Sequence, residues 1–144
     1  MKALVIHGPN LDLLGTRELE VYGSATLGEI NASIVADAQA LDMEVDIHQT
    51  AREGEIIELL HAGINTVDGA LLNPAAYSHT SRAIADAIRA VPFPVVEVHL
   101  SNIHAREPWR HVSVIAEAAV GVVAGFGAAS YTVGLRALRS VVER

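Results

Sequence analysis

The chain has 144 residues, of which 51% are hydrophobic and only 4% aromatic, and its formal net charge is −7. This length predicts a single domain over residues 1–144 with an aliphatic core, and an acidic chain without a Lys/Arg cluster is a poor candidate for binding nucleic acid or an anionic membrane. The absence of cysteine excludes disulfides, Cys-ligated zinc and thiol catalysis; with no transmembrane-length apolar run and no signal-peptide pattern, we expect a cytoplasmic protein.

Short apolar runs alternate with amphipathic segments along the chain. The runs predicted to be strands are 3–7, 43–49, 69–73, 94–100 and 121–125. The helical stripes between them are Leu27, Ile30, Ile34, Ala38 and Leu41; Ile56, Ile57, Leu60 and Ile64; Ile84, Ile88 and Val91; and Tyr131, Leu135, Leu138 and Val142. Thr26, with Glu29 three residues later, forms a capping-box pattern before the first stripe.

This alternation predicts an α/β fold, a parallel sheet covered on both faces. Five strands in this length favour a flavodoxin-like three-layer α/β/α sandwich with strand order 2-1-3-4-5. The run at 43–49 alternates in hydrophobicity and is expected at an edge of the sheet. The runs at 3–7, 69–73 and 121–125 are almost continuously apolar, which is typical of central strands.

Polar residues gather where the predicted strands end, and open α/β sheets bind ligands at that edge. Asn10 follows the first strand, Asn73 ends the third, and Glu97 and His99 lie two apart on the fourth, so they share one face. A carboxylate beside an imidazole suits proton transfer. A satisfied structural pair is the alternative, and each asparagine alone is also a common turn residue.

Further basic residues follow the third and fourth strands. His79 opens the helix after Asn73, and Arg106 and Arg110 lie in the segment 101–111. Two arginines near this edge favour an anionic ligand such as a carboxylate, although a solvated charged loop would look the same.

Other kinds of site find less support. His99, His104 and His111 could bind a metal, but their spacing matches no compact ligand motif. The segment 125–130, GFGAAS, resembles a degenerate dinucleotide fingerprint, yet it follows the last strand rather than the first. Lys2 is the only lysine, so Schiff-base catalysis is improbable.

The connection 15–23, GTRELEVYG, places Arg17 and Tyr22 between two glycines, above the same edge. A tyrosine acts as a base only if its pKa, about 10 in model peptides, falls toward neutrality, and a neighbouring arginine lowers such a pKa by roughly one to three units. The segment therefore suits a tyrosinate base. The alternative is that Tyr22 anchors the loop and Arg17 is solvated.

Three ordered motifs carry a resemblance that covers nearly the whole chain: HGPNLDLLGTRELEVYG, NPAAYSHTS and EVHLSNIHAREPWRH. The chain resembles the type II dehydroquinases (3-dehydroquinate dehydratases). The resemblance implies the flavodoxin-like fold, a homo-oligomer that is a dodecamer built from trimers, and no metal or cofactor. It also implies a reversible anti elimination of water from 3-dehydroquinate, giving 3-dehydroshikimate, in the shikimate pathway of aromatic amino acid (chorismate) biosynthesis or in quinate breakdown.

The resemblance assigns a role to each catalytic position. Tyr22, activated by Arg17, would remove the proton beside the ketone, and Asn10 would hold a water that stabilises the enolate. His99, positioned by Glu97, would protonate the departing hydroxyl.

The resemblance also implies the substrate contacts. The backbone N–H groups of Leu100 and Ser101 would hold the substrate carboxylate. Ring hydroxyls would be contacted by Asn73, His79 and Arg110. Asp86 would reach the site of a neighbouring subunit, and Arg106 would lie in the surround of the site.

Some positions depart from the family pattern. His7 and Asp12 stand where asparagine is common, Leu19 replaces a usual proline, Ala51 and Arg52 are unusual, and Val112 stands where histidine is frequent. None of these has an assigned role, so the departures concern the behaviour of the loop and efficiency more than the reaction. A binding module that kept the fold without catalysis is the main alternative from another class.

Overall fold

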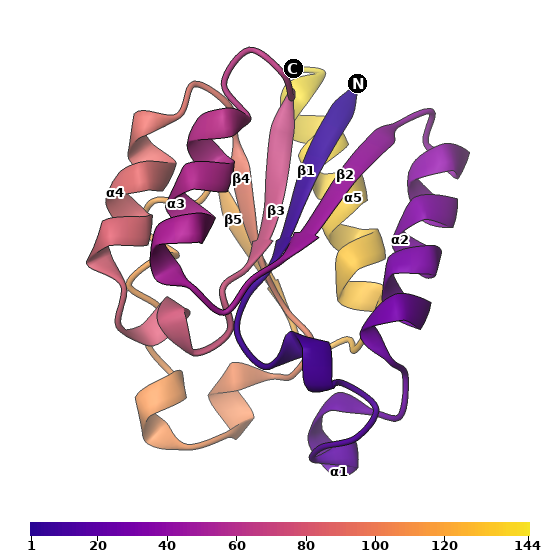
Figure 1. Cartoon of the computed structure of the whole chain (residues 1–144), viewed down its shortest axis with the longest axis vertical. Coiled ribbons are helices and arrows are strands. Elements are labelled where there is room, and N and C mark those ends of the chain that lie inside the picture. Colours follow the sequence, from indigo (N-terminus) through magenta and orange to yellow (C-terminus); the bar gives the residue numbers. More distant parts are fainter.

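The computed structural model describes all residues, 1–144, and its centre is a parallel sheet of five strands in the order β2-β1-β3-β4-β5 (Figure 1). The strands are β1 (Lys2–His7), β2 (Glu44–Gln49), β3 (Gly69–Asn73), β4 (Val95–His99) and β5 (Gly121–Ala124). The predicted strand order is confirmed. β1, β3 and β4 are buried along almost their whole length, as expected for strands covered on both faces.

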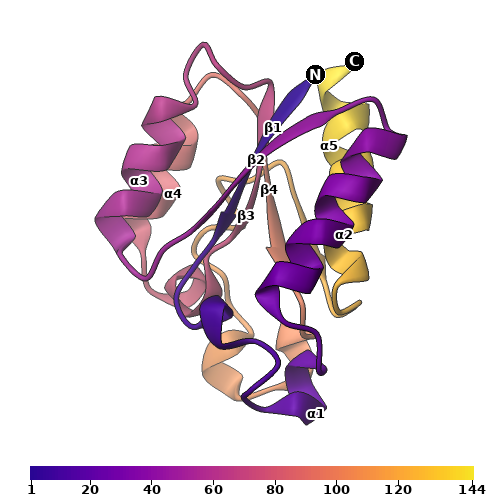
Figure 2. The same cartoon turned by 45° about the vertical axis from the view of Figure 1, so that its right-hand side comes forward.

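Helices cover both faces of the sheet. α2 (Leu27–Ala40) and α5 (Ala129–Val142) pack on one face, and α3 (Glu53–Ala62) and α4 (Arg82–Ala90) pack on the other (Figures 1 and 2). Each face has its own core, because alternate strand residues point to opposite sides. Val5 and Leu71 belong to the first core, whereas Ile6 and Leu72 belong to the second.

Side-chain caps fix where two of these helices begin. The Thr26 hydroxyl accepts from the backbone N–H of Glu29 at 3.2 Å, and the Ser81 hydroxyl accepts from that of Ile84 at 3.0 Å. The cap at Thr26 agrees with the sequence pattern. One member of the predicted stripes, Ile64, lies beyond the end of α3 and is exposed.

One sequence expectation about the strands is wrong. The apolar character of the run 121–125 favours a central strand, whereas the predicted strand order puts this run at an edge; β5 is the edge strand opposite β2, and Gly121 and Val122 are exposed. Continuous apolar character therefore does not reflect burial from both sides at this strand.

The strands all end at the same side of the molecule, which also carries α1 (Leu19–Tyr22) and the short 3-10 helices at Leu11–Leu13, Ala75–His79, Ile103–Ala105 and Pro108–Arg110. The two termini lie at the opposite side (Figure 1). None of the helices has both the length and the apolar character needed to cross a membrane. The connections that carry the predicted site residues thus share one end of the sheet.

Candidate active site

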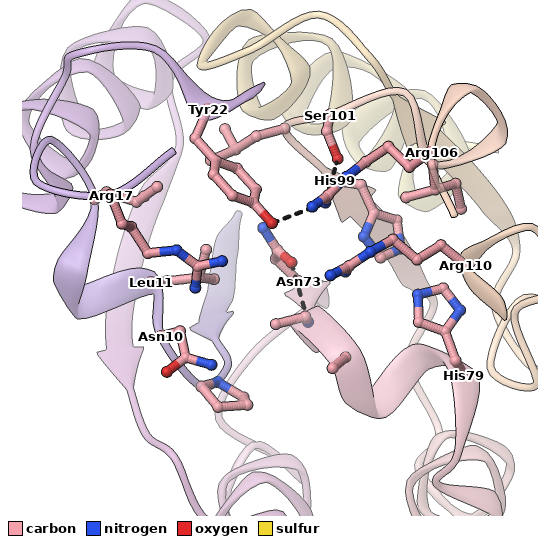
Figure 3. A pocket seen from close by; sticks show the side chains of 16 residues that line it. Asn10, Leu11, Arg17, Tyr22, Asn73, His79, His99, Ser101, Arg106 and Arg110 are labelled. Atoms are coloured by element: carbon pink, nitrogen blue, oxygen red, sulfur yellow. Dashed lines mark hydrogen bonds between the residues drawn. The ribbon is translucent and has the colours of Figure 1, made fainter. Parts of the chain in front are cut away.

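A pocket with about 580 Å³ of unfilled space, part of it open to solvent, lies over the carboxyl ends of β1, β3 and β4 (Figure 3). Its lining residues are Pro9, Asn10, Leu11, Leu14, Arg17, Tyr22, Asn73, Ala75, Ala76, His79, His99, Leu100, Ser101, Ile103, Arg106 and Arg110. Most of the residues predicted from the sequence therefore meet here. They come from segments that are distant in the chain and are brought together by the strand order.

The pocket is positively charged although the chain is acidic. Arg17, Arg106 and Arg110 line it, and no carboxylate does. Figure 3 shows Arg17 and Arg110 pointing into the same space from opposite sides. Glu18 and Glu107 pair with two of these arginines. Because an unpaired or half-neutralised guanidinium cluster favours an anion, the pocket suits a small ligand with a carboxylate.

Tyr22 lies between two of the arginines. Arg106 Nη1 donates to the Tyr22 hydroxyl at 2.8 Å and to Ser101 Oγ at 3.2 Å. The guanidinium carbons of Arg17 and Arg106 lie 4.9 and 5.0 Å from the centre of the Tyr22 ring. The structure thus brings Arg17 to Tyr22, but the direct hydrogen bond to the phenol comes from Arg106, to which the sequence assigned only a place in the surround.

Glu97 and His99 form a buried pair behind the pocket, with His99 alone reaching its lining. His99 Nε2 lies 2.7 Å from Glu97 Oε1. Two serines also donate to this carboxylate: Ser78 at 2.9 Å and Ser113 at 2.8 and 2.9 Å. Burial raises the pKa of Glu97, but the hydrogen bond from His99 and those from the serines outweigh burial and hold the pKa below its usual value.

His79 has a defined tautomer. Its Nδ1 lies 2.8 Å from the carbonyl oxygen of Val112, which can only accept, so Nδ1 carries the proton. Burial lowers the pKa of His79, although the hydrogen bond to Val112 opposes this. The neutral ring therefore keeps Nε2 as an acceptor for a ligand hydroxyl.

The two asparagines of the pocket are held by unusual backbone. Asn10 has a left-handed conformation with φ of 69°, which asparagine tolerates better than most residues. Asn73 Oδ1 accepts from the backbone N–H of Ala75 at 3.2 Å, and Ala75 has φ of 52°. A non-glycine residue with such a φ is strained, and this kind of strain concentrates at functional sites.

Asp86 is the predicted substrate residue that the pocket of this chain does not include. It lies on the exposed side of α4, where it pairs with Arg89 at 3.4 Å. Its role at a neighbouring subunit stays a prediction.

Ser78 and Ser113 are the residues that the sequence did not indicate. No local pattern marks them, because their partner Glu97 is 19 and 16 residues away. For metal binding, no group of three or more His, Asp or Glu side chains lies close enough together to hold an ion.

Comparison with known proteins gives one consistent family. The model of the class II dehydroquinases matches residues 1–139. A 3-dehydroquinate dehydratase of Geotalea daltonii is 52% identical over 144 residues, the whole of both chains, and one of Synechocystis is 53% identical over 137 residues, 95% of this chain and 90% of the other. The crystal structure of a type II dehydroquinase from Butyrivibrio crossotus is similar with a TM-score of 0.94 and 37% identity, covering 96% of this chain and 97% of that one.

Proposed function

This chain belongs to the class II dehydroquinase family and is a 3-dehydroquinate dehydratase, a hydro-lyase, and on that premise we propose that it removes water from 3-dehydroquinate by anti elimination through an enolate. Tyr22 is the base, His99 is the acid, and 3-dehydroshikimate is the product. The observation that carries the proposal is the Tyr22 hydroxyl, which lies in an arginine-lined pocket and accepts a hydrogen bond from Arg106 at 2.8 Å.

Tyr22 removes the proton on the carbon beside the ketone. Its phenolate is stabilised by the N–H of Arg106 and by the positive charge of Arg17 over the ring. The partly closed pocket strengthens both interactions because less water screens them. This support differs from the sequence hypothesis, in which Arg17 alone activates the tyrosine.

Negative charge then develops on the ketone oxygen as the enolate forms. Asn10 holds a water that donates to this oxygen, which stabilises the charge only once it develops. Asn10, in the connection after β1, lines the pocket, which supports this role.

His99 completes the elimination by giving a proton to the departing hydroxyl. Its Nε2 is engaged with Glu97, so Nδ1 is the ring nitrogen left for the substrate. The ionised Glu97 stabilises the imidazolium that must exist before this transfer. The serine hydroxyls that hold Glu97 keep the pair in one geometry.

The remaining polar groups anchor the substrate. The backbone N–H groups of Leu100 and Ser101 hold its carboxylate, and Arg110 and Asn73 donate to ring hydroxyls. His79 accepts from one through Nε2. The excess of arginine over carboxylate in the pocket supports this assignment for an anionic substrate.

The product feeds the shikimate pathway of aromatic amino acid biosynthesis, or the same step serves quinate breakdown. We further propose that the chain assembles as a dodecamer of trimers in which Asp86 reaches a neighbouring site. The unpaired edge of β5 supports assembly, because Val120, Val122 and Phe126 expose apolar surface there.

The test is to mix the purified chain with 3-dehydroquinate and chelator and to follow the ultraviolet absorbance of the conjugated enone. We expect wild type to produce the signal and Tyr22→Phe to lower kcat by about 10²- to 10⁴-fold, which is the usual contribution of a general base. Tyr77→Phe is the matched control, since its hydroxyl donates to the Ala51 carbonyl and does not line the pocket.

Three results would contradict the proposal. A silent wild type that is folded and assembled would favour the binding-module alternative. An active wild type whose rate survives in Tyr22→Phe would place the base elsewhere. Loss of activity that depends on the chelator would point to a metal-dependent reaction.

A further inference from the structure

A buried chain of polar groups runs from the pocket into the space between β1 and α5. Asn73, at the floor of the pocket, donates from Nδ2 to the Tyr131 hydroxyl at 3.0 Å. The Tyr131 hydroxyl lies 2.7 Å from His7 Nδ1, and His7 Nε2 lies 2.8 Å from Asn31 Oδ1. Tyr131 and His7 are almost fully buried and do not line the pocket, so they cannot contact a ligand there.

Strand register and helix packing bring His7, Asn73 and Tyr131 together. His7 and Asn73 are paired neighbours at the ends of β1 and β3. Both point to the face that α2 and α5 cover, which is where Tyr131, in the first turn of α5, packs. The His7 and Tyr131 rings meet edge to face with their centroids 5.1 Å apart.

The protons of these hydrogen-bonded groups can be placed by elimination. The backbone N–H of Ala75 can only donate, so the Asn73 atom that faces it at 3.2 Å is the oxygen and the nitrogen faces Tyr131. Because the Tyr131 oxygen accepts from Asn73, its own proton goes to His7 Nδ1. The remaining ring proton of His7 then lies on Nε2 and donates to Asn31.

The charges of the groups agree with this placement. Burial raises the pKa of Tyr131, so its hydroxyl keeps the proton that it donates. Burial also lowers the pKa of His7 to about 4, although the hydrogen bond to Asn31 opposes this, so the ring is neutral and Nδ1 is free to accept.

These hydrogen bonds decide which groups Asn73 offers to a ligand. One Nδ2 proton is used by Tyr131, which leaves the second N–H for the pocket, and the oxygen is held by Ala75. Without the Tyr131 hydroxyl, only the single bond from Ala75 would orient the amide. Figure 3 shows the Asn73 side chain at the centre of the lining groups, between Asn10 and Tyr22.

We propose that Tyr131 and His7 are positioning residues that fix the Asn73 amide, so that it presents one N–H donor to an acceptor oxygen of the substrate. This proposal rests on the function proposed above, in which Asn73 contacts a ring hydroxyl. Neither Tyr131 nor His7 touches substrate; both act through Asn73.

A double-mutant cycle with Tyr131→Phe and Asn73→Ala tests the proposal. Tyr131→Phe keeps the ring and its packing and removes only the hydroxyl. We expect it to raise KM by about five-fold, the value of one neutral hydrogen bond, with kcat changed by less than about two-fold. In the Asn73→Ala background the same change should have almost no effect on KM, because its target is gone.

The control is again Tyr77→Phe, which loses one hydrogen bond of a tyrosine outside the pocket and should leave the KM of each background, with and without Asn73, unchanged. A thermal shift in Tyr131→Phe would not by itself support the proposal, since any buried hydroxyl affects stability. Equal increases in KM with and without Asn73 would overturn it, as would an unchanged KM in Tyr131→Phe.

A crystal structure of Tyr131→Phe gives a readout that does not depend on the reaction. We expect the Asn73 amide to adopt a second rotamer or to rotate away from Tyr131. An Asn73 side chain in its wild-type position would overturn the positioning role. A wild type without dehydratase activity would refute the proposed function instead, and the crystal structure would still decide whether Tyr131 holds Asn73.

Discussion

His7 places a titratable ring in the interior of the protein. Burial lowers its pKa from 6.5 to about 4, although the hydrogen bond to Asn31 opposes this. Between these values the unfolded chain binds a proton that the folded chain does not. The free energy of unfolding therefore falls as the pH is lowered through this window, and is fully restored above it.

His7→Asn removes this titrating group. Wild type should lose about 3 kcal/mol of stability between pH 6.5 and 4 through His7, from about 2.5 pKa units at 1.36 kcal/mol each. The variant should lack this part of the loss. Denaturant unfolding at several pH values measures the difference.

His61→Asn, at an exposed position of α3, is the matched control for that experiment. It should follow the wild-type dependence on pH. If His7→Asn lost stability toward acid as steeply as wild type does, other groups would carry the acid sensitivity and the ring of His7 would not be held neutral by burial.

At the scale of elements, the pocket depends on how closely the ends of β1 and β3 approach each other. The backbone N–H of Gly8 donates to the Asn73 carbonyl at 2.7 Å. A Cβ at Gly8 would lie 2.7 Å from the Pro74 carbonyl carbon and 2.8 Å from its oxygen, so it would force the two backbones apart. Asn10, two residues after Gly8, and Asn73, directly before Pro74, would move with these backbones.

Gly8→Ala should therefore destabilise the protein by about 1–3 kcal/mol, the usual cost of overpacking, and should lower kcat/KM as well. Thermal unfolding and the enone assay measure the two effects. The matched control is Gly54→Ala in α3, where nothing lies within 4 Å of the added carbon and alanine favours the helix. A Gly8→Ala protein as stable and active as wild type would mean that the contact yields easily.

The sequence predicts local elements better than it predicts contacts between them. The periodic stripes locate α2 and α5, and the strand 69–73 has the predicted bounds, because neighbouring residues decide these features. The inference of a central β5 from its apolar character was wrong, while the predicted strand order placed it correctly, since edge position depends on strand order rather than on composition. The helical turn at Leu19–Tyr22 was not expected in the connection after β1.

The candidate site also has a part that the sequence predicts and a part that it does not. The end-of-strand rule brings Asn10, Asn73 and His99 to one pocket, because the order of parallel strands settles which ends meet. The bond between Arg106 and Tyr22 joins residues 84 apart in the chain and depends on two irregular segments. No periodicity encodes such a contact, so the sequence could assign only Arg17 to the tyrosine.

At the scale of the whole molecule, the charge is unevenly distributed. The chain carries a net charge of −7, yet the pocket is lined by three arginines and no carboxylate. Because a cleft lined by charges of one sign focuses the electric field, the pocket attracts a small anion although the chain as a whole is acidic. The net charge of the chain thus does not indicate the charge of its pocket.

The exposed edge of β5 is the feature of the whole molecule that calls for a partner. Its outer side is unpaired, and Val122, within this strand, is 45% exposed. An apolar open edge promotes pairing with another chain, and a lysine is a common means of preventing this. Because the proposed dodecamer has to cover such surface, Val122→Lys should dissociate it into smaller folded species, observed by sedimentation together with circular dichroism.

Ile64→Lys is the matched control, since Ile64 is also exposed, at 37%, but lies past the end of α3 rather than on an edge strand. It should leave the assembly intact. If Asp86 reaches a neighbouring site, the dissociated Val122→Lys protein should also lose activity beyond any loss of stability, because its pockets then lack the partner's carboxylate. A wild type that sediments as a single 15.2 kDa chain would refute both the dodecamer and the role of Asp86.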